Sequence, residues 1–217
     1  MFYWVKTNRF IKWLFRNQVW SIPNAENTVY LTFDDGPTPE ITPWVLDVLQ
    51  AENIKATFFC IGKNIKNHPD IFKRIITVGH AVGNHTFNHK NGWKTSFKDY
   101  IEEVDLCEKA ILDFGSFDKL NTEHCKLFRP PYGKVTPLQS KFLRKQGYKI
   151  IMWDVLTADF DTTITKEKCF KNATEKIESG SVIVFHDSVK AKPNLIYALP
   201  KAIAYYKEKG YKFEIIS

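Results

Sequence analysis

The chain contains 217 residues, which is enough for one domain. Hydrophobic residues make up 44% of it and charged residues 25%, which excludes wholesale disorder, a collagen-like repeat and a polytopic membrane protein. The net charge of +7 favours either an anionic partner or simply a well-solvated basic surface. No nucleic-acid-binding motif accompanies this charge, so nucleic acid is not an expected partner.

Residues 1–22 form a basic, aromatic segment ahead of the rest of the chain. Three apolar residues recur at helical spacing: Phe10, Trp13 and Leu14. Three basic residues fall on another face of the same helix: Arg9, Lys12 and Arg16. Such a helix either contacts an anionic membrane surface through residues 2–20 or packs its aromatic side chains against the end of the domain. The sequence contains no recognisable secretion signal or transmembrane stretch, which leaves the cytoplasm and the periphery of the inner membrane as alternative locations.

From residue 28 onward, short apolar runs alternate with amphipathic ones. The predicted strands are 28–33, 56–60, 81–84, 126–128, 148–152, 181–185 and 211–215, and the predicted helices are 41–51, 69–78, 97–114, 136–146, 166–178 and 195–209. Seven alternating βα units predict a single parallel α/β domain over residues 23–217, either a nearly closed barrel or an open sheet. No glycine-rich phosphate loop follows a strand, which argues against a nucleotide-binding open sheet.

The four cysteines show neither metal-binding nor redox spacing. Cys60, Cys107, Cys125 and Cys169 are scattered through the chain, with no CxxC pair among them. A bridge between Cys107 and Cys125 stays open at this point.

Polar residues that are unusual for strand ends follow five of the predicted strands. They are Asp34-Asp35-Gly36, the run from His85 to His89, the run from Arg129 to Gly133, the pair Asp154 and Asp159, and His186-Asp187. The carboxyl ends of parallel barrel strands share one rim, where active sites lie. The sequence therefore predicts that these residues meet in one site.

His85 and His89 are four residues apart, so both rings point the same way on a helical turn. Two imidazoles and one carboxylate suit a divalent metal ion with one position left for water: zinc first, with cobalt or nickel as alternatives. Adjacent carboxylates on a sharp turn diverge, so one of Asp34 and Asp35 binds the metal and the other stays free as a base. The alternative for this pair is an ordinary Asp-Asp-Gly turn.

Three further residues suggest catalytic roles. Arg129, directly before two prolines, is suited to hold a carboxylate ionised. The backbone N–H at Tyr132 can face a developing oxyanion, and His186 is a candidate general acid. The alternative for Arg129 is a surface arginine in an ordinary proline turn, and His186 taken alone is more typical of a structural histidine.

These motifs resemble those of the polysaccharide deacetylases, carbohydrate esterase family 4, also called the NodB-homology domain. The family's first motif resembles residues 32–37, its His-Ser/Thr-x-x-His motif residues 85–89, its Arg-Pro-Pro-Tyr-Gly motif residues 129–133, and its apolar strand ending in His-Asp residues 182–187. The four motifs stand in family order and the resemblance covers residues 28–215. It implies a distorted, incomplete (β/α)7 barrel.

The resemblance also implies roles for the individual residues. Asp34 would be the catalytic base, and Asp35, His85 and His89 would hold one divalent metal ion. Arg129 would orient the base, and His186 would be the acid. Three residues would line the oxyanion and substrate site: Tyr132, Pro131 and Trp153.

The family's fourth motif, Asp-Ser/Thr-x-Asp-Trp, is the one that this chain does not match in full. The aligned residues 156–160 read Leu-Thr-Ala-Asp-Phe, so Leu156 stands where the family has a carboxylate. The resemblance links that carboxylate to the acid histidine. Either Asp154 or Asp159 supplies the missing charge, or His186 works with less help.

The implied reaction is metal-dependent hydrolysis of N-acetyl groups on N-acetylglucosamine-type units, with release of acetate. Chitin oligomers, peptidoglycan and another envelope glycan are alternative substrates. Trp44, Trp93 and Trp153 are candidates either for stacking on sugar rings or for packing. Competing functions are a metal phosphoesterase and a non-catalytic sugar-binding protein, and no pattern indicates an oligomeric state.

Overall fold

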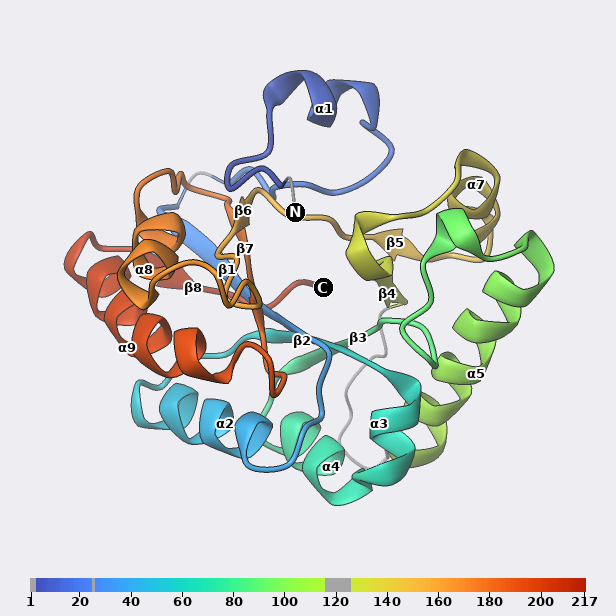
Figure 1. Cartoon of the computed structure of the whole chain (residues 1–217), viewed down its shortest axis with the longest axis horizontal. Coiled ribbons are helices and arrows are strands. Elements are labelled where there is room, and N and C mark those ends of the chain that lie inside the picture. The colour runs from blue at the N-terminus through green and yellow to red at the C-terminus, as the bar shows by residue number, and fades with distance from the viewer. Residues whose placement is uncertain (1–2, 25, 116–125) are drawn as a thin grey trace.

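The computed structural model describes residues 3–24, 26–115 and 126–217 (Figure 1). Its strands are β1 (Thr28–Asp34), β2 (Thr57–Cys60), β3 (Ala81–Asn84), β4 (Leu127–Phe128), β5 (Lys149–Ile150), β6 (Val155–Leu156), β7 (Val182–His186) and β8 (Lys212–Phe213). Its α-helices are α1 (Arg9–Leu14), α2 (Ile41–Ala51), α3 (Gly62–Asn67), α4 (Pro69–Thr77), α5 (Phe97–Gly115), α7 (Pro137–Lys145), α8 (Lys166–Thr174) and α9 (Lys192–Glu208). Two 3-10 turns, η1 (Gly92–Lys94) and η2 (Pro131–Gly133), complete the set.

The strands form one parallel, curled sheet in the order β5-β4-β3-β2-β1-β7-β6, with β8 added to the beginning of β1. In Figure 1 the helices surround this sheet, and β5 and β6 lie at its two ends. No pairing joins β5 directly to β6 among the described residues. The predicted distorted, incomplete barrel in a single domain is therefore confirmed.

The seven predicted strands and six predicted helices are all present, with shifted ends. The longest overestimate is the helix predicted over 166–178, which ends at Thr174. Two elements were missed, the two-residue strand β6 and the helix α3. Both are too short to show a hydrophobic period, since β6 has two residues and α3 buries only Gly62 and Ile65.

The cysteine question is settled only in part. Cys60, Cys107 and Cys169 are buried free thiols, whereas Cys125 lies outside the described residues. Among the described helices, none combines the length and apolar character that a bilayer span requires.

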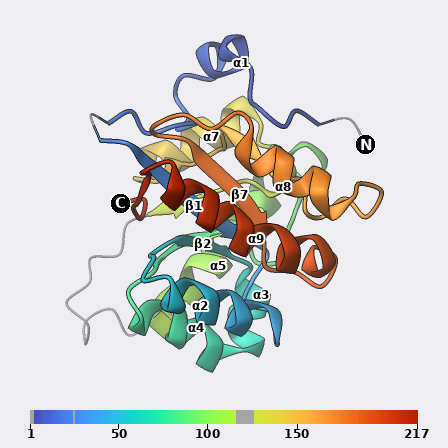
Figure 2. The ribbon, with the colours of Figure 1, turned by 90° about the vertical axis from the view of Figure 1, so that its left-hand side faces the viewer.

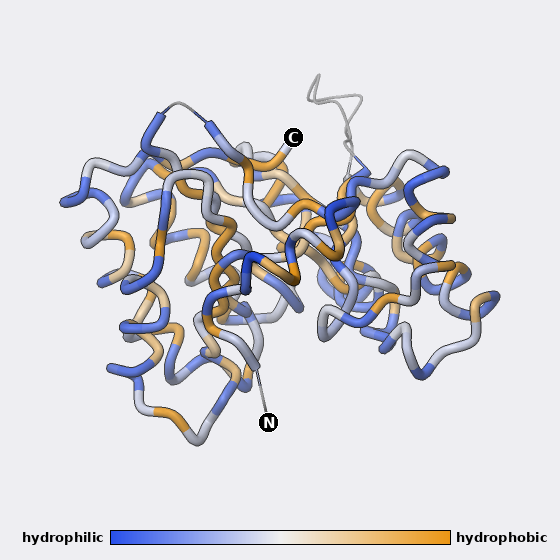
Figure 3. The backbone as a smooth tube through the Cα atoms, turned by 90° about the horizontal axis from the view of Figure 1, so that it is seen from above, coloured by the Kyte–Doolittle hydropathy of each residue, from blue (hydrophilic) through white to orange (hydrophobic). Residues whose placement is uncertain are grey.

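Alternation along β1 separates the two faces of the sheet. All seven of its residues are buried. Val29, Leu31 and Phe33 belong to the main hydrophobic cluster beneath the outer helices, where the Phe33 ring stacks on Phe58 at 5.0 Å between centroids. Because successive side chains point to opposite faces, Thr32 and Asp34 project into the barrel interior. Figure 3 shows the outer helices alternating between hydrophobic and hydrophilic residues, as helices that cover a core do.

The N-terminal segment lies between the two ends of the sheet. On one side the Val19 N–H donates to the Ile150 carbonyl at 2.8 Å, and the Met152 N–H donates to the Val19 carbonyl at 2.7 Å. On the other side, at β6, the Thr7 N–H donates to the Asp154 carbonyl and the Leu156 N–H donates to the Val5 carbonyl, both at 2.8 Å. Figures 1 and 2 show α1 standing outside the barrel above this segment. The backbone of residues 5–19 thus bridges the gap that the strands leave open.

Asp154 anchors this segment from inside the gap. Its side chain is only 1% exposed and accepts hydrogen bonds from Lys6 at 2.7 Å, Lys12 at 2.5 Å and the Ser181 hydroxyl at 2.5 Å. Burial alone would raise the pKa of Asp154, but the hydrogen bonds from Lys12, Lys6 and Ser181 outweigh it and lower that pKa. Asp154 therefore serves the N-terminal segment and not the acid histidine.

Replacing Asp154 by Asn should lower the free energy of unfolding by about 1–3 kcal/mol, because two ammonium groups lose a buried partner. The matched control is Glu178→Gln, since Glu178 also contacts Lys6, at 3.4 Å, but is 76% exposed. That control should change stability by no more than about 0.5 kcal/mol. Urea denaturation of both variants measures the difference, and equal effects would contradict an anchoring role for Asp154.

Candidate active site

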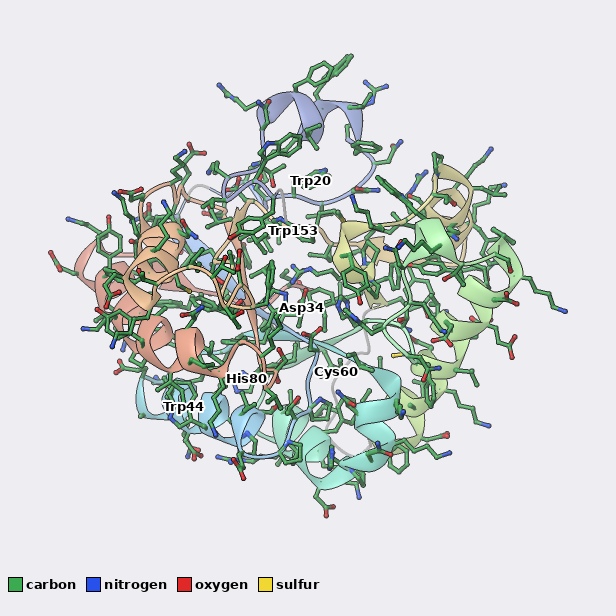
Figure 4. All side chains as sticks on the ribbon, viewed as in Figure 1. Trp20, Asp34, Trp44, Cys60, His80 and Trp153 are labelled. Carbon is green, nitrogen blue, oxygen red and sulfur yellow. The ribbon has the colours of Figure 1, made fainter. Side chains whose placement is uncertain are left out.

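The polar residues that follow the strands converge on one rim of the barrel. Asp34 ends β1, His186 ends β7, and the segments holding His85 and Arg129 follow β3 and β4. Asp34 and His186 are also direct partners in the parallel register of β1 and β7. Figure 4 shows Asp34 near the centre of the ring of strands. The structure thus brings these motifs to one rim with one exception, Asp154, which lies in the gap of the barrel and binds Lys6 and Lys12.

Asp35, His85 and His89 form a cluster suited to a metal ion. One ligand atom from each lies within 4.8 Å of the others. Asp35 Oδ1 lies 3.4 Å from His89 Nε2 and 3.8 Å from His85 Nε2. This oxygen is buried and has no hydrogen-bond partner among the described residues. An unsatisfied carboxylate oxygen facing two imidazole nitrogens is the donor set that a divalent cation satisfies.

The surroundings keep the two imidazoles neutral. The Nδ1–H of His85 donates to the Arg129 carbonyl at 2.7 Å, which turns Nε2 toward Asp35. Burial lowers the pKa of His85 to about 4 and also lowers the pKa of His89. Neutral imidazoles bind a metal without first releasing a proton at neutral pH.

Several residues of this rim have left-handed backbone conformations. The φ angle is +87° at Asp35, +61° at Thr86, +56° at His89 and +60° at Tyr132, none of which is a glycine. Such conformations cost about 1–3 kcal/mol each and persist where neighbouring contacts fix them. At Asp35 the neighbour is Asn64 of α3, whose side-chain amide donates to the Asp35 carbonyl at 2.8 Å.

Arg129 is fully buried and holds Asp34 in place. Its Nη1 lies 2.7 Å from Asp34 Oδ1 and also donates to the Thr32 hydroxyl at 2.7 Å. Its other nitrogens donate to the Ile151 and Met152 carbonyls, at 3.2 and 2.8 Å. Each of the three guanidinium nitrogens thus donates a hydrogen bond, which is how a buried Arg–carboxylate pair avoids an uncompensated charge.

This pair keeps Asp34 ionised. Burial opposes ionisation, yet the nearby Arg129, with smaller contributions from His85 and His186, lowers the pKa of Asp34 below its usual value. Asp34 Oδ2 lies 4.0 Å from His85 Nε2, so the carboxylate stands beside the metal cluster. Asp34 is therefore a charged carboxylate adjacent to the site where Asp35 would bind a metal.

His186 lies across from this cluster and is held by Asp159. The His186 Nδ1 is 2.8 Å from Asp159 Oδ1, and the His186 backbone N–H donates to the other oxygen of the same carboxylate at 2.7 Å. Burial would lower the pKa of His186, but the charge and hydrogen bond of Asp159, with Asp35 and Asp34, raise it to about 9. Of the two carboxylates left open by the sequence, Asp159 is the one that contacts the histidine.

The predicted substrate residues have different surroundings. Tyr132 is 53% exposed and its ring packs 4.5 Å from that of His89, while Pro131 before it is buried. The part-buried Trp153 packs beneath this turn, so close that a Cβ at Gly133 would lie 2.7 Å from its ring. Trp93 is 63% exposed, with Lys134 Nζ 3.9 Å from its ring centroid. Trp44 packs against the main hydrophobic cluster, so packing accounts for it.

Two further residues support the site: the sequence placed Asp187 at the rim without giving it a role, and it missed Glu103. Asp187 accepts hydrogen bonds from the Gly36 N–H and the Thr42 hydroxyl, and burial raises its pKa to about 7. Glu103 on α5 accepts from the backbone and side chain of Asn88, between the two histidines. Glu103 is buried on the apolar face of its helix, so an acidic residue at that helical position is a signal that was readable from the sequence.

Comparisons with known proteins agree with this geometry. A family model described as polysaccharide deacetylase matches residues 21–151. A peptidoglycan-N-acetylglucosamine deacetylase of Bacillus cereus is 32% identical over 199 residues, covering 91% of this chain and 90% of the relative. The peptidoglycan-N-acetylmuramic acid deacetylase PdaA of Bacillus subtilis is 30% identical, covering 88% and 70%.

Solved structures show the same likeness. A crystal structure of a peptidoglycan N-acetylglucosamine deacetylase in complex with an N-oxidanyl-benzamide superposes with a TM-score of 0.86 at 33% identity, covering 94% of each chain. A pseudoenzyme of carbohydrate esterase family 4 from Bacillus anthracis gives a TM-score of 0.80 at 25% identity, covering 92% of this chain and 67% of that one. The fold and the site together define a hydrolase of the carbohydrate esterase type. The chain belongs to the polysaccharide deacetylase family.

The contact between His186 and Asp159 predicts a pH-dependent contribution to stability. The pKa of His186 is raised to about 9 from 6.5, so its contribution is fully present below about pH 6.5 and is lost as pH rises through about 9. Asp159→Asn should therefore reduce the free energy of unfolding more at pH 6 than at pH 10. In NMR titration of metal-free protein, the same variant should lower the pKa of His186. An unchanged pKa would contradict the assigned contact.

Proposed function

We propose that this protein removes N-acetyl groups from N-acetylglucosamine units of peptidoglycan in a metal-dependent reaction, releasing acetate. The observation that carries the proposal is the juxtaposition of an ionised Asp34, a three-residue metal cluster and a protonated His186 on one rim. Peptidoglycan is placed ahead of chitin oligomers and other envelope glycans because relatives that align with more than nine-tenths of this chain are named for it.

The metal ligands in this proposal are Asp35, His85 and His89. When bound there, a zinc ion, or cobalt or nickel in its place, supplies a Lewis acid that lowers the pKa of water. The unsatisfied Asp35 oxygen and the two neutral imidazoles provide the negative charge and the lone pairs that such an ion requires.

The remaining chemistry belongs to residues of the chain. Asp34, kept ionised by Arg129, accepts a proton from the attacking water. The backbone N–H of Tyr132 stabilises the oxyanion that forms from the acetamide carbonyl, a contribution of about 3–4 kcal/mol for one such donor. His186, protonated at neutral pH through Asp159, gives its proton to the departing amine nitrogen. Acetate and a free glucosamine unit result.

Two other functions have weaker support. A dinuclear phosphoesterase needs a second group of bridging carboxylates, and the described residues hold one candidate metal cluster, with a single carboxylate in it. A non-catalytic role has a precedent in the pseudoenzyme of the same fold. Here, however, Arg129 is hydrogen-bonded to the proposed base Asp34, and Asp159 is hydrogen-bonded to the proposed acid His186. Sugar binding alone does not require these two contacts.

Acetate release tests the proposed reaction directly. Protein stripped with a chelator should release acetate from peptidoglycan and from N-acetylglucosamine oligomers only after zinc is added back. Zinc binding without acetate from either polymer would contradict deacetylation of these glycans. Phosphate release from a generic phosphomonoester in the same assay would favour the phosphoesterase instead.

Two variants separate the base from the metal site. Asp34→Asn should keep stoichiometric zinc, because Asp34 is not a ligand, and should lower kcat by at least about a hundredfold, as loss of a general base does. His89→Ala is the counterpart, and it should lose bound zinc in elemental analysis. Wild-type activity in the first variant, or full zinc content in the second, would overturn the assigned role.

A further inference from the structure

The N-terminal helix α1 presents its apolar side chains to solvent. Phe10, Trp13, Leu14 and Phe15 are 62%, 64%, 54% and 42% exposed, and no residue of α1 is buried. The Phe10 and Trp13 rings lie 5.8 Å apart between centroids, so these two side chains contact each other. We call these four residues the outer aromatic patch. These four side chains stay largely exposed, although Ile11 of the same helix and Trp20 after it pack against the domain. Packing against the domain therefore accounts for part of the segment but not for the patch.

Helix α1 differs from an ordinary surface helix, because Ile11 is the one apolar side chain of the helix that packs against the domain. Its Lys12 points inward and binds the buried Asp154, as does Lys6 just ahead of the helix. A helix on a globular surface normally buries its apolar side chains and exposes its charges. Here the ion pairs with Asp154 hold the apolar side chains outward.

The patch is held in a defined position. The side chain of Asn8 caps the first turn by accepting from the Phe10 N–H at 2.8 Å. At the other end, the indole N–H of the buried Trp20 donates to the Phe15 carbonyl at 3.1 Å. The flanking backbone pairs with Asp154 and Ile150 at the two ends of the sheet. The exposed aromatic residues are therefore part of the folded domain.

The charges beside the patch indicate what covers it. Arg9 begins α1 and Arg16 follows its end, and both side chains are exposed. Among the described residues, no acidic group forms an ion pair with either of them within 4.0 Å. The chain as a whole carries a net charge of +7. Trp, Phe and Leu beside unpaired basic residues are typical of helices that lie in the interface of an anionic bilayer.

We propose that the outer aromatic patch docks this domain on an anionic lipid surface, with Phe10, Trp13, Leu14 and Phe15 entering the interface and Arg9 and Arg16 contacting lipid phosphates. Figures 1 and 4 show α1 standing apart from the ring of strands that surrounds Asp34, so docking leaves the catalytic rim uncovered. This inference is independent of the proposed deacetylation, since it involves none of the residues of that site.

Vesicle cosedimentation of the full chain tests the inference. The protein should bind vesicles of phosphatidylcholine with about one-third phosphatidylglycerol, bind pure phosphatidylcholine weakly, and lose binding as salt is raised. Phe10→Ser combined with Trp13→Ser should weaken binding by about tenfold or more, because two interfacial aromatic groups are removed. Arg9→Gln and Arg16→Gln should each weaken it by about fivefold.

The matched control replaces equally exposed apolar residues elsewhere. Leu112 on α5 and Leu138 on α7 are 53% and 62% exposed, so Leu112→Ser with Leu138→Ser should leave vesicle binding unchanged. Activity on a soluble oligomer should be the same in the Phe10/Trp13 variant, which separates docking from catalysis. Absence of binding to anionic vesicles, or equal binding by the Phe10/Trp13 variant, would overturn the proposal. So would a wild-type dimer that this variant dissociates, because the patch would then join two copies of the chain.

Discussion

The buried ion pair between Arg129 and Asp34 is the interaction on which the site depends. A fully buried guanidinium needs its charge and donors compensated, and here its three nitrogens donate to Asp34, Thr32 and the carbonyls of Ile151 and Met152. These partners come from β1 and from the chain just after β5. The curled sheet is thus required to bring the two together, and the pair in turn keeps the pKa of Asp34 low.

The N-terminal segment is connected to the same pair through one residue. Met152 uses its carbonyl to accept from Arg129 at 2.8 Å, and its N–H donates to the Val19 carbonyl at 2.7 Å. The segment that closes the barrel therefore contacts the peptide units that orient the guanidinium. On the other side of the gap, Tyr3 donates to Asp161 and its ring packs against Phe160, which contacts the His186 ring at 5.0 Å. Both the base and the acid have indirect contact with residues 3–22.

Much of the fold was readable from the sequence because its strands are apolar on both faces and its helices have a clear period. The missed elements, α3 and β6, are too short for either signal. Their positions follow from tertiary contacts: Asn64 of α3 binds the Asp35 carbonyl, and β6 pairs with β7 and with Val5. The clustering of Asp35, His85 and His89 was predictable because parallel strands share one rim.

What the sequence left open was decided by side-chain geometry. Asp154 and Asp159 lie on either side of β6, and the sequence left open which of them serves the histidine. In the structure Asp154 meets two lysines and Asp159 meets His186. The outward face of α1 was equally hidden, because helical spacing identifies an apolar stripe but not the side toward which it points.

The most direct measurement for the central claim is the pH dependence of kcat/KM for zinc-loaded wild type and Arg129→Lys. A lysine keeps the positive charge but cannot donate in a planar fork to Asp34, Ile151 and Met152 together. If Arg129 keeps Asp34 ionised as the base, the acidic limb of the profile should move to higher pH while bound zinc stays stoichiometric. An acidic limb that superposes on that of the wild type, in a folded variant, would contradict the account.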